Sequence, residues 1–382
     1  MTSLLLLVPD TGQILYQRHS VKREPVSSVL YLPLSATHTY ASSFFSQLIG
    51  FDSTTKSMRW ASFSPMLLCL LFSEADTCDA FFDVLIQETK NLFFLTISPL
   101  NKHGTVDSTA LQRQLLLHSA QFNQLLATFE SCPSFVLDAI SCAPLSDESK
   151  ANISLVLNQW TQTLDCAVGA VYSEGNLVSA TASWWEQLSV TVMRQISIVI
   201  SSSSNTLVDT TVFLPLSEDA SPVRIVIVSI TSQTSLALLC PEDLAVDNIS
   251  ASCSAWSSCL SVVESHQHEL PLHVLAATVM VTESRCCYNF GTSSDLKKLT
   301  AELLEMRLDL HAMLTGNLPM ELLDKPSELY HVFEDFKVYV LSTSRYFVAA
   351  LLSEQAPIYA LRSITTQLLD SLIAMKLFAQ IS

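Results

Sequence analysis

The stretch "EGNLVSATASWWEQL" (residues 174–188) contains a turn, a strand and the start of a helix. Residues 166–172 before it are apolar enough for a strand, residues 173–175 have turn composition, and residues 176–180 predict a returning strand. Ser183 and Glu186 have the spacing of a capping box, in which each side chain accepts from the other residue's backbone N–H. The sequence therefore predicts a tight hairpin that leads into a helix.

Trp184 and Trp185 account for two of the five tryptophans in the chain. Such a pair can stack on bases or sugars, anchor at a membrane interface, or fill space where a helix starts on a sheet. Packing is favoured because no nearby basic residue completes a nucleic-acid surface. We therefore predict a structural role for both tryptophans and for the two capping residues. If the Trp185 ring is buried, replacing it by Ala is expected to cost about 3–5 kcal/mol.

The hairpin pattern occurs three times, beginning near residues 3, 166 and 272. About 60 residues after each start comes a second shared pattern of strand, Ser/Thr-containing turn, strand, Leu-Leu and a glutamate that opens a helix. Helical periodicity is present at residues 76–97, 107–130, 183–200, 241–264, 294–315 and 356–379. Residues 92–98 fit this repeat better as a helix end than as a strand. The order predicts an α+β fold in which helices flank antiparallel sheets.

Two polar, turn-rich segments, at residues 141–150 and 264–271, divide these three repeats. A chain of 382 residues is also longer than a single core usually supports. We therefore predict three domains, at residues 1–144, 145–268 and 269–382.

The net charge of −16 argues against binding to nucleic acid or to anionic lipid. Apolar runs such as residues 66–72 are far shorter than the roughly 20 residues that cross a bilayer. No signal-peptide pattern is present at the N-terminus, so we expect a cytosolic chain. Hydrophobic residues make up 49% and charged residues only 15%, which indicates that a partner covers part of the surface.

Only seven glycines are present, and no phosphate-binding loop, dinucleotide-binding or hydrolase motif occurs. The ten cysteines include no C-x-x-C pair and read as small buried hydrophobes. Residues 264–273 are rich in Glu and His, but they lack the spacing of a zinc site and read as a solvated linker. We therefore expect no enzyme activity of the chain itself, no catalytic or metal-binding residue and no cofactor.

Arg59, Trp60 and Phe63 are the candidates for contact with a partner. They lie in a predicted strand, where alternation places Trp60 on one face and the other two on the opposite face. Packing is favoured over partner contact for Trp60. The last predicted helix carries an apolar stripe that includes Ile358 and Leu361 and is expected to cover the third sheet.

Several short motifs resemble the Fuzzy planar cell polarity effector family, whose members consist of three longin domains and are related to Inturned and to the Mon and Ccz vesicle-fusion proteins. The similar stretches are "LVSATASWWEQL" (177–188), "RWASFSPMLLCLLFSE" (59–74), "LPLSEDASPVRIVIVSI" (214–230), "LALLCPEDLA" (236–245) and "ALRSITTQLLDSL" (360–372). The likeness follows the order of segments over most of the chain. It implies three tandem longin-like domains.

The resemblance further implies a subunit of a ciliogenesis and planar polarity effector complex, located in the cytoplasm near the basal body. There the chain would pair with an Inturned-like protein through its first domain and assemble with a WD-repeat protein. The pair would regulate a Rab-like small GTPase as an effector platform or by guanine nucleotide exchange. The alternatives are a Mon-like subunit of an endosomal Rab exchange factor and a vesicle-trafficking scaffold without exchange activity.

Overall fold

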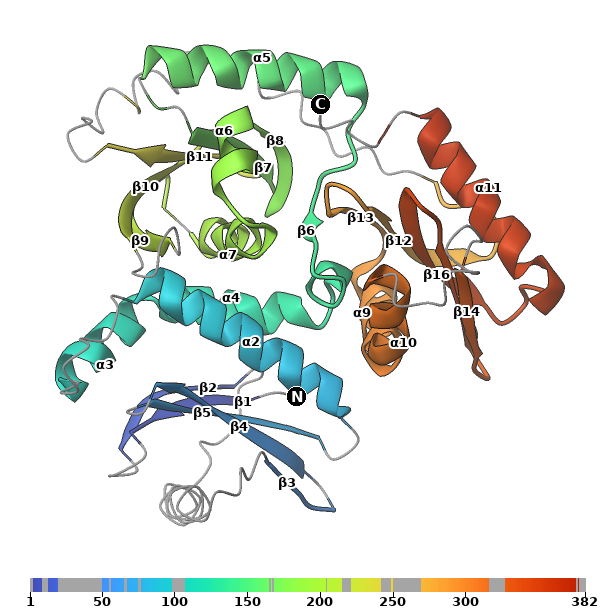
Figure 1. The fold of residues 1–382 in the computed structure, drawn as a ribbon, viewed down its shortest axis with the longest axis horizontal. Coiled ribbons are helices and arrows are strands. Elements are labelled where there is room, and N and C mark those ends of the chain that lie inside the picture. Colours follow the sequence, from blue (N-terminus) through green and yellow to red (C-terminus); the bar gives the residue numbers. More distant parts are fainter. Residues whose placement is uncertain are drawn as a thin grey trace. The chain divides into compact units, whose positions relative to one another are not determined.

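Two antiparallel strands that are consecutive in sequence and paired with each other begin each of three sheets in the computed structural model, as the sequence predicts (Figure 1). The chain divides into two compact units, Met1–Ala127 and Thr128–Ser382. The structure describes residues 3–8, 13–19, 50–54, 56–64, 67–74, 77–97, 107–164, 166, 168–203, 205–214, 221–241, 249, 269–315, 327–375 and 377. Most of the helix predicted at residues 241–264 lies outside these ranges, as do residues 264–268. In the described part of the chain, no helix is long and apolar enough to span a membrane.

The first unit contains one antiparallel sheet with the strand order β2-β1-β5-β4-β3. Its strands are β1 (Ser3–Leu7), β2 (Ile14–His19), β3 (Gly50–Asp52), β4 (Lys56–Ser64) and β5 (Leu67–Glu74). The helices that follow are α2 (Asp79–Thr96), α3 (Ser108–Leu117) and α4 (Ser119–Phe129), the last of which ends in the second unit. The helix α2 continues to Thr96, which confirms the prediction that residues 92–98 end a helix rather than form a strand.

The second unit begins with the 3-10 turn η2 (Pro133–Phe135) and contains two sheets. The first of these has the order β8-β7-β11-β10-β9. Its elements are α5 (Asp147–Thr163), β7 (Val168–Ser173), β8 (Asn176–Ala180), α6 (Ala182–Gln187), α7 (Val190–Ser201), β9 (Leu207–Leu214), β10 (Ser221–Ser229) and β11 (Thr234–Cys240). Leu157 and Trp160 of α5 share a buried core with Val171 and Leu238 of the sheet. The face of β7 that carries Val171 is therefore covered by α5.

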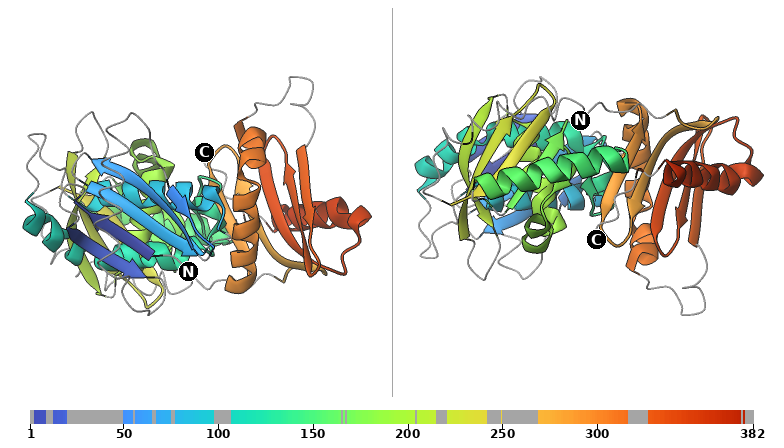
Figure 2. Two further views of the ribbon diagram at one scale, coloured as in Figure 1. Left: turned by 90° about the horizontal axis from the view of Figure 1, so that it is seen from below. Right: turned by 90° about the horizontal axis from the view of Figure 1, so that it is seen from above.

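The other sheet of this unit has the order β14-β15-β16-β12-β13-β6 and lies between two helical layers (Figure 2). Its elements are β6 (Ile140–Ser141), β12 (Val274–Val281), β13 (Cys286–Gly291), α9 (Ser293–Glu305), α10 (Arg307–Thr315), β14 (Ser327–Val332), β15 (Phe336–Ser342), β16 (Tyr346–Ser353), η4 (Ile358–Ala360) and α11 (Leu361–Ala374). One face of this sheet forms a core cluster with the helices α9 and α10, to which β12, β13, β15 and β16 contribute side chains. The helix α11 lies on the other face of the sheet.

The same strand order recurs in all three sheets. In each, the first strand of the hairpin pairs with the second and with the fifth, and the third strand lies at the edge beside the fourth. Every pairing within these five-stranded arrangements is antiparallel, and helices pack against the sheets. The α+β class predicted from the sequence is confirmed.

The short strand β6 connects the two sheets of the second unit. It pairs in parallel with β13, and the next residue, Cys142, forms a parallel bridge with Leu177 of β8. The amide of Ile140 donates to the Arg285 carbonyl at 2.9 Å, and the amide of Ala143 donates to the Leu177 carbonyl at 2.9 Å. One segment thus occupies the hairpin-side edge of both sheets. Residues 141–144, which the sequence assigns to a polar linker, are part of this connection.

Side chains reinforce the connection. The Ser141 hydroxyl donates to Asn176 Oδ1 of β8 at 2.6 Å and accepts from Asn289 Nδ2 of β13 at 3.1 Å. Arg194 of α7 is almost fully buried and donates to the Ala139 carbonyl and to the Asp138 carboxylate, each at 3.1 Å. A hydrogen-bonded path therefore runs from β8 through β6 to β13.

The helix after the second hairpin begins differently from its prediction. Helix α6 starts at Ala182, with Thr181 as its N-cap and no side-chain hydrogen bond at the cap. The Thr181 hydroxyl accepts from the Gly169 amide of β7 at 3.2 Å instead. The capping box predicted for Ser183 and Glu186 is therefore wrong, because Ser183 already lies inside the first turn.

The single helix predicted at residues 183–200 is two helices. Leu188, after α6, has extended backbone, and Ser189 is the N-cap of α7, where its hydroxyl accepts from the Val192 amide at 3.3 Å. The helix predicted at 107–130 is likewise divided into α3 and α4 at His118, and that at 294–315 into α9 and α10 at Met306.

Helix α11 covers the third sheet as predicted, but it is shorter. It begins at Leu361, and its buried residues include Leu361, Leu368 and Leu372 of the predicted stripe. Ile358 belongs to η4 before the helix and is 55% exposed. The predicted apolar stripe does not extend to Ile358, because this residue lies in the 3-10 turn before the α-helix and so does not have the α-helical spacing of the later residues.

Gly291 is expected to tolerate no side chain. It ends β13 with φ 115°, and a Cβ there would lie 2.8 Å from the Leu275 carbonyl and 2.8 Å from Ala276 Cβ. Gly291→Ala should therefore lower the free energy of unfolding by about 1–3 kcal/mol, measured by urea denaturation. The control is Gly169→Ala, whose Cβ would meet the ends of the Leu238 and Thr161 side chains. If both variants lost the same free energy of unfolding, the positive φ and the close backbone contacts of Gly291 would not be the cause.

Candidate functional site

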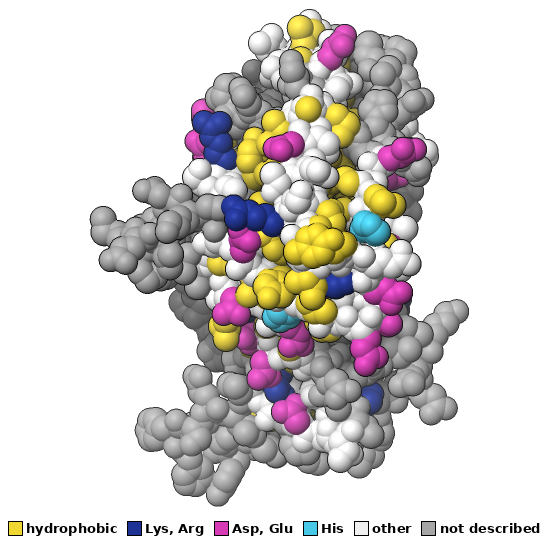
Figure 3. Space-filling view, turned by 90° about the vertical axis from the view of Figure 1, so that its right-hand side faces the viewer, with side chains coloured by type: hydrophobic (Ala, Val, Ile, Leu, Met, Phe, Trp, Pro, Cys, Tyr) yellow, Lys and Arg dark blue, Asp and Glu magenta, His cyan; other side chains and the backbone are white. Residues whose placement is uncertain are grey.

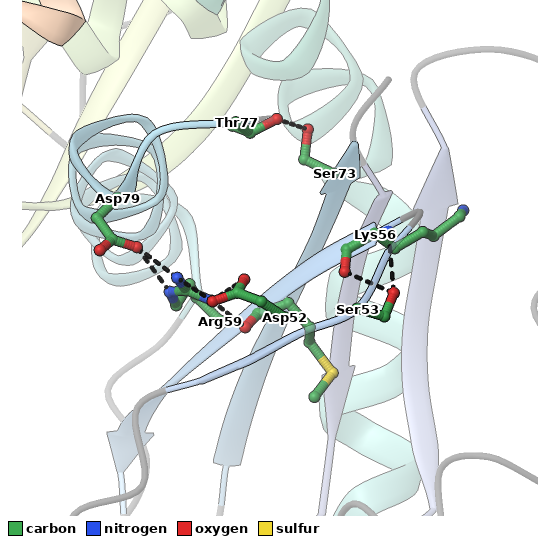
Figure 4. A network of polar contacts seen from close by, with 8 residues as sticks. Asp52, Ser53, Lys56, Arg59, Ser73, Thr77 and Asp79 are labelled. Carbon is green, nitrogen blue, oxygen red and sulfur yellow. Dashed lines mark hydrogen bonds and ion pairs between the residues drawn. The ribbon is translucent and has the colours of Figure 1, made fainter. Parts of the chain in front are cut away.

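Arg59 on β4 is the centre of a polar network in the first unit (Figure 4). Its Nη1 and Nη2 donate to the two carboxylate oxygens of Asp52 at 2.8 and 3.1 Å, and its Nε donates to Asp79 Oδ1 at 3.0 Å. The guanidinium carbon lies 5.3 Å from the centre of the Phe82 ring. Because Asp52 ends β3 and Asp79 begins α2, Arg59 ties a sheet edge to the first turn of a helix.

One guanidinium is shared by two carboxylates in this network, so the network has a net negative charge. Hydrogen bonds from Arg59, and secondarily from Ser57, lower the pKa of Asp52. The hydrogen bond to Asp52 is the main cause that raises the pKa of Arg59. The Arg59 side chain is only 14% exposed, whereas Asp52 and Asp79 are 58% and 75% exposed. The solvent-facing part of the network is therefore acidic.

The partner-contact candidates are packed within the first unit. Phe63 is 5% exposed and lies 5.7 Å from Phe93 of α2, so it shares the α2 side of the sheet with Arg59. By strand alternation Trp60 is expected on the other face, and it is 6% exposed. The shared face of Arg59 and Phe63 is confirmed, and the position of Trp60 on the other face stays a prediction from strand alternation. Their role in binding a partner stays a prediction, and the exposed carboxylates of Asp52 and Asp79, which sequence reasoning missed, belong to the same surface.

Arg59→Ala should raise the pKa of Asp52 towards that of an ordinary aspartate, as measured by NMR titration of the carboxyl carbon. The ionised form of Asp52 is the one stabilised in the folded state. Its contribution to stability is therefore present at neutral pH and lost as the pH falls through the folded-state pKa. Arg224→Ala is the matched control, because Arg224 lowers the pKa of Asp209 in the second sheet in the same way. An Asp52 pKa that Arg59→Ala leaves unchanged would contradict this account.

The adjacent tryptophans Trp184 and Trp185 have different surroundings. Trp184 is 0% exposed and makes an edge-on contact with Tyr172, at a distance of 6.3 Å between ring centres. Trp185 is half-buried, and Glu186 is exposed. The fully buried ring is therefore that of Trp184, and not that of Trp185, for which the sequence analysis considered burial. The packing role of the pair and of Ser183 stays a prediction.

A surface that the sequence analysis did not single out lies on the third sheet. What we call the β14 patch consists of four exposed hydrophobic side chains on β14 and η4: Tyr330 (55% exposed), Val332 (47%), Ile358 (55%) and Tyr359 (91%). Figure 3 shows hydrophobic side chains gathered on the face of the molecule where α11 lies. Arg362 of α11 pairs with Glu328 of β14 at 3.2 Å, which places the start of α11 beside this strand.

The described residues show no cluster of side chains suited to a metal ion. No group of three or more His, Cys, Asp or Glu side chains among them is placed to hold a metal ion. Of the Glu- and His-rich segment, His273 is described, and its Nδ1 lies 3.3 Å from the Ser353 hydroxyl.

No protein-family model matches the sequence, and no curated protein sequence matches it.

Proposed function

We propose that this chain is a non-catalytic subunit of a ciliogenesis and planar polarity effector complex. It consists, in this proposal, of three longin-like domains at residues 1–144, 145–268 and 269–382. The observation that carries the proposal is the strand order shared by the three sheets, each entered through a hairpin. A five-stranded antiparallel sheet entered in this way and flanked by helices is the longin plan.

The proposed partners are an Inturned-like longin protein, a WD-repeat planar polarity effector and a Rab-like small GTPase. The chain acts in the cytoplasm near the base of the cilium and reaches membranes only through these partners. With the Inturned-like protein it forms a platform for the GTPase. Exchange then requires no covalent chemistry, because a surface that binds the nucleotide-poor conformation of the GTPase more tightly favours nucleotide release.

The low charged fraction and the network around Arg59 support pairing through the first domain. Asp52 and Asp79 present acidic groups beside the edge strand β3, on a sheet whose strand order leaves that edge without a further strand among the described residues. An obligate interface of this kind buries roughly 2,000 Å² or more. We expect the chain to be poorly soluble alone and to be rescued by co-expression with the Inturned-like partner.

Co-expression tests the pairing. The full chain and the unit Thr128–Ser382 are each produced with a tagged Inturned-like protein and with a tagged Ccz-like protein. We expect the full chain to co-purify with the Inturned-like protein but not with the Ccz-like protein. The unit Thr128–Ser382 should co-purify with neither of these two proteins. Recovery with the Ccz-like protein would favour the Mon-like alternative. Pairing by Thr128–Ser382 would place the main interface outside the first domain.

Nucleotide release from the GTPase separates a regulator from a scaffold. A GTPase loaded with fluorescent GDP is mixed with the purified pair, with the chain alone or with buffer. Faster release with the pair supports exchange activity, while binding without faster release supports an effector platform. Absence of binding would remove the GTPase from the proposal. The chain alone should retain no GTP through gel filtration, because its sequence contains no phosphate-binding loop.

A further inference from the structure

We propose that the outer edge of β14 binds an extended segment of a partner protein as an additional strand of the third sheet. The segment would carry apolar side chains at alternate positions and at least one Lys or Arg between them. This site lies outside the first domain and does not depend on which GTPase or longin partner the chain has.

The strand β14 has an open side. All six of its residues pair with β15 on one side, and among the described residues no strand pairs with the other. The unpaired N–H and C=O groups of an edge strand accept an incoming strand through main-chain hydrogen bonds. The chemistry at this edge therefore selects an extended peptide over a helix.

The side chains of β14 select apolar residues. Alternate residues face the α11 side, because Tyr330 lies opposite Tyr339, while Leu329 on the other face joins the core beneath α9. On the α11 side Tyr330 and Val332 are exposed and, with Ile358 and Tyr359 of η4, make up the β14 patch. Phe333, after the strand, instead stacks on Phe336, which packs against the core beneath α9. A strand added at this edge would place every second side chain against the patch.

The corresponding edge strands of the other sheets differ. In the first sheet β3 has only three residues. In the second sheet β9 carries no exposed large hydrophobic side chain among its described residues, and its Asp209 is held by Arg224 at 2.8 Å. Short or charged edges are the usual protection against unwanted pairing. Of the three equivalent strands, β14 alone combines a full-length edge with an exposed apolar row.

The charges around β14 indicate which charge the partner segment should carry. Residues 327–335 contain Glu328, Glu334 and Asp335 and no Lys or Arg. Glu334 and Asp335 are exposed, and the nearby Arg362 is engaged with Glu328. A second copy of this acidic chain would bring like charges together. A basic segment complements the edge instead.

The probe is a blocked eight-residue peptide that alternates valine and lysine, labelled with a fluorophore. Binding to the full chain is measured by fluorescence anisotropy. We expect a Kd below about 100 μM, and at least about tenfold weaker binding when glutamate replaces lysine or when alternate backbone amides are N-methylated. Absence of binding, or equal binding by the N-methylated peptide, would overturn the proposal.

Two variants locate the site. Tyr330→Lys should weaken binding at least about tenfold, because it removes an apolar contact and adds a like charge. Thr211→Lys, at an exposed position of β9, is the matched control and should bind as the unmodified chain does. Hydrogen exchange of the unmodified chain gives a readout that needs no variant, since the peptide should slow exchange of amides in β14. Protection confined to other strands, or equal weakening by both variants, would place the site elsewhere.

Discussion

Replacing Trp184 by Ala is expected to lower the free energy of unfolding by about 3–5 kcal/mol. The indole is completely buried beside Tyr172, and its N–H has no hydrogen-bond partner among the described residues. The loss therefore comes from the transfer energy of the ring and from the cavity that it leaves, with no polar contact to subtract. Urea denaturation followed by circular dichroism measures it.

Trp185→Ala is the matched control for this prediction. Trp185 is the same residue type at the next position, but it is only half-buried, so its removal should cost clearly less. Glu186→Ala, at an exposed position, should be close to neutral. If Trp185→Ala proved as destabilising as Trp184→Ala, the assignment of Trp184 as the buried member of the pair would be wrong.

A chain that begins at residue 145 is expected to be much less stable than one that begins at Thr128. The segment between them carries Leu137, Ala139 and Ile140, each no more than 1% exposed, and the first two belong to the core beneath α9. Burial of a Leu or Ile side chain contributes about 1.5–3 kcal/mol, and whole domains have only about 5–15 kcal/mol. Loss of the segment therefore removes a large part of the available stability.

The comparison uses residues 128–382 and 145–382, expressed identically and unfolded in urea. We expect a cooperative transition for the longer chain and a lower midpoint, or no folded baseline, for the shorter one. Leu137→Ala in the longer chain isolates one contact, and about 2–5 kcal/mol is expected for it. Equal midpoints for the two chains would show that β6 contributes nothing to the unit. Pairing experiments with a shortened chain should therefore begin at Thr128.

The central strands of the sheets were predictable from sequence because they are long, apolar and interrupted by turn residues. The second hairpin is an example: Glu174 and Gly175 have φ of 50° and 81°, as its turn requires, and β7 and β8 begin within two residues of their predicted starts. The third strand of each repeat, β3, β9 or β14, was not individually located. Strand β14, for example, alternates exposed and half-buried residues and lacks a continuous apolar run.

The remaining differences have local causes. Strand β6 has two residues, which is too few for any periodic pattern, and its partner β13 lies far along the chain. The capping box failed because the Thr181 hydroxyl bonds to β7, so the helix begins before Ser183. Adjacent helical residues point about 100° apart, so the sequence alone could not decide which tryptophan faces the sheet.

The position of β6 also affects the order in which the second unit forms. Ser141 bonds to Asn289, and Leu137 to Arg285, across a sequence separation of 148 residues in each case. During synthesis β6 leaves the ribosome long before β13 exists, so these contacts must wait until the chain has been made at least as far as β13. Contacts of such separation slow folding because a large loop has to close before they form. We expect the second and third sheets to acquire their final connection late, as one step rather than as two domains completed in turn.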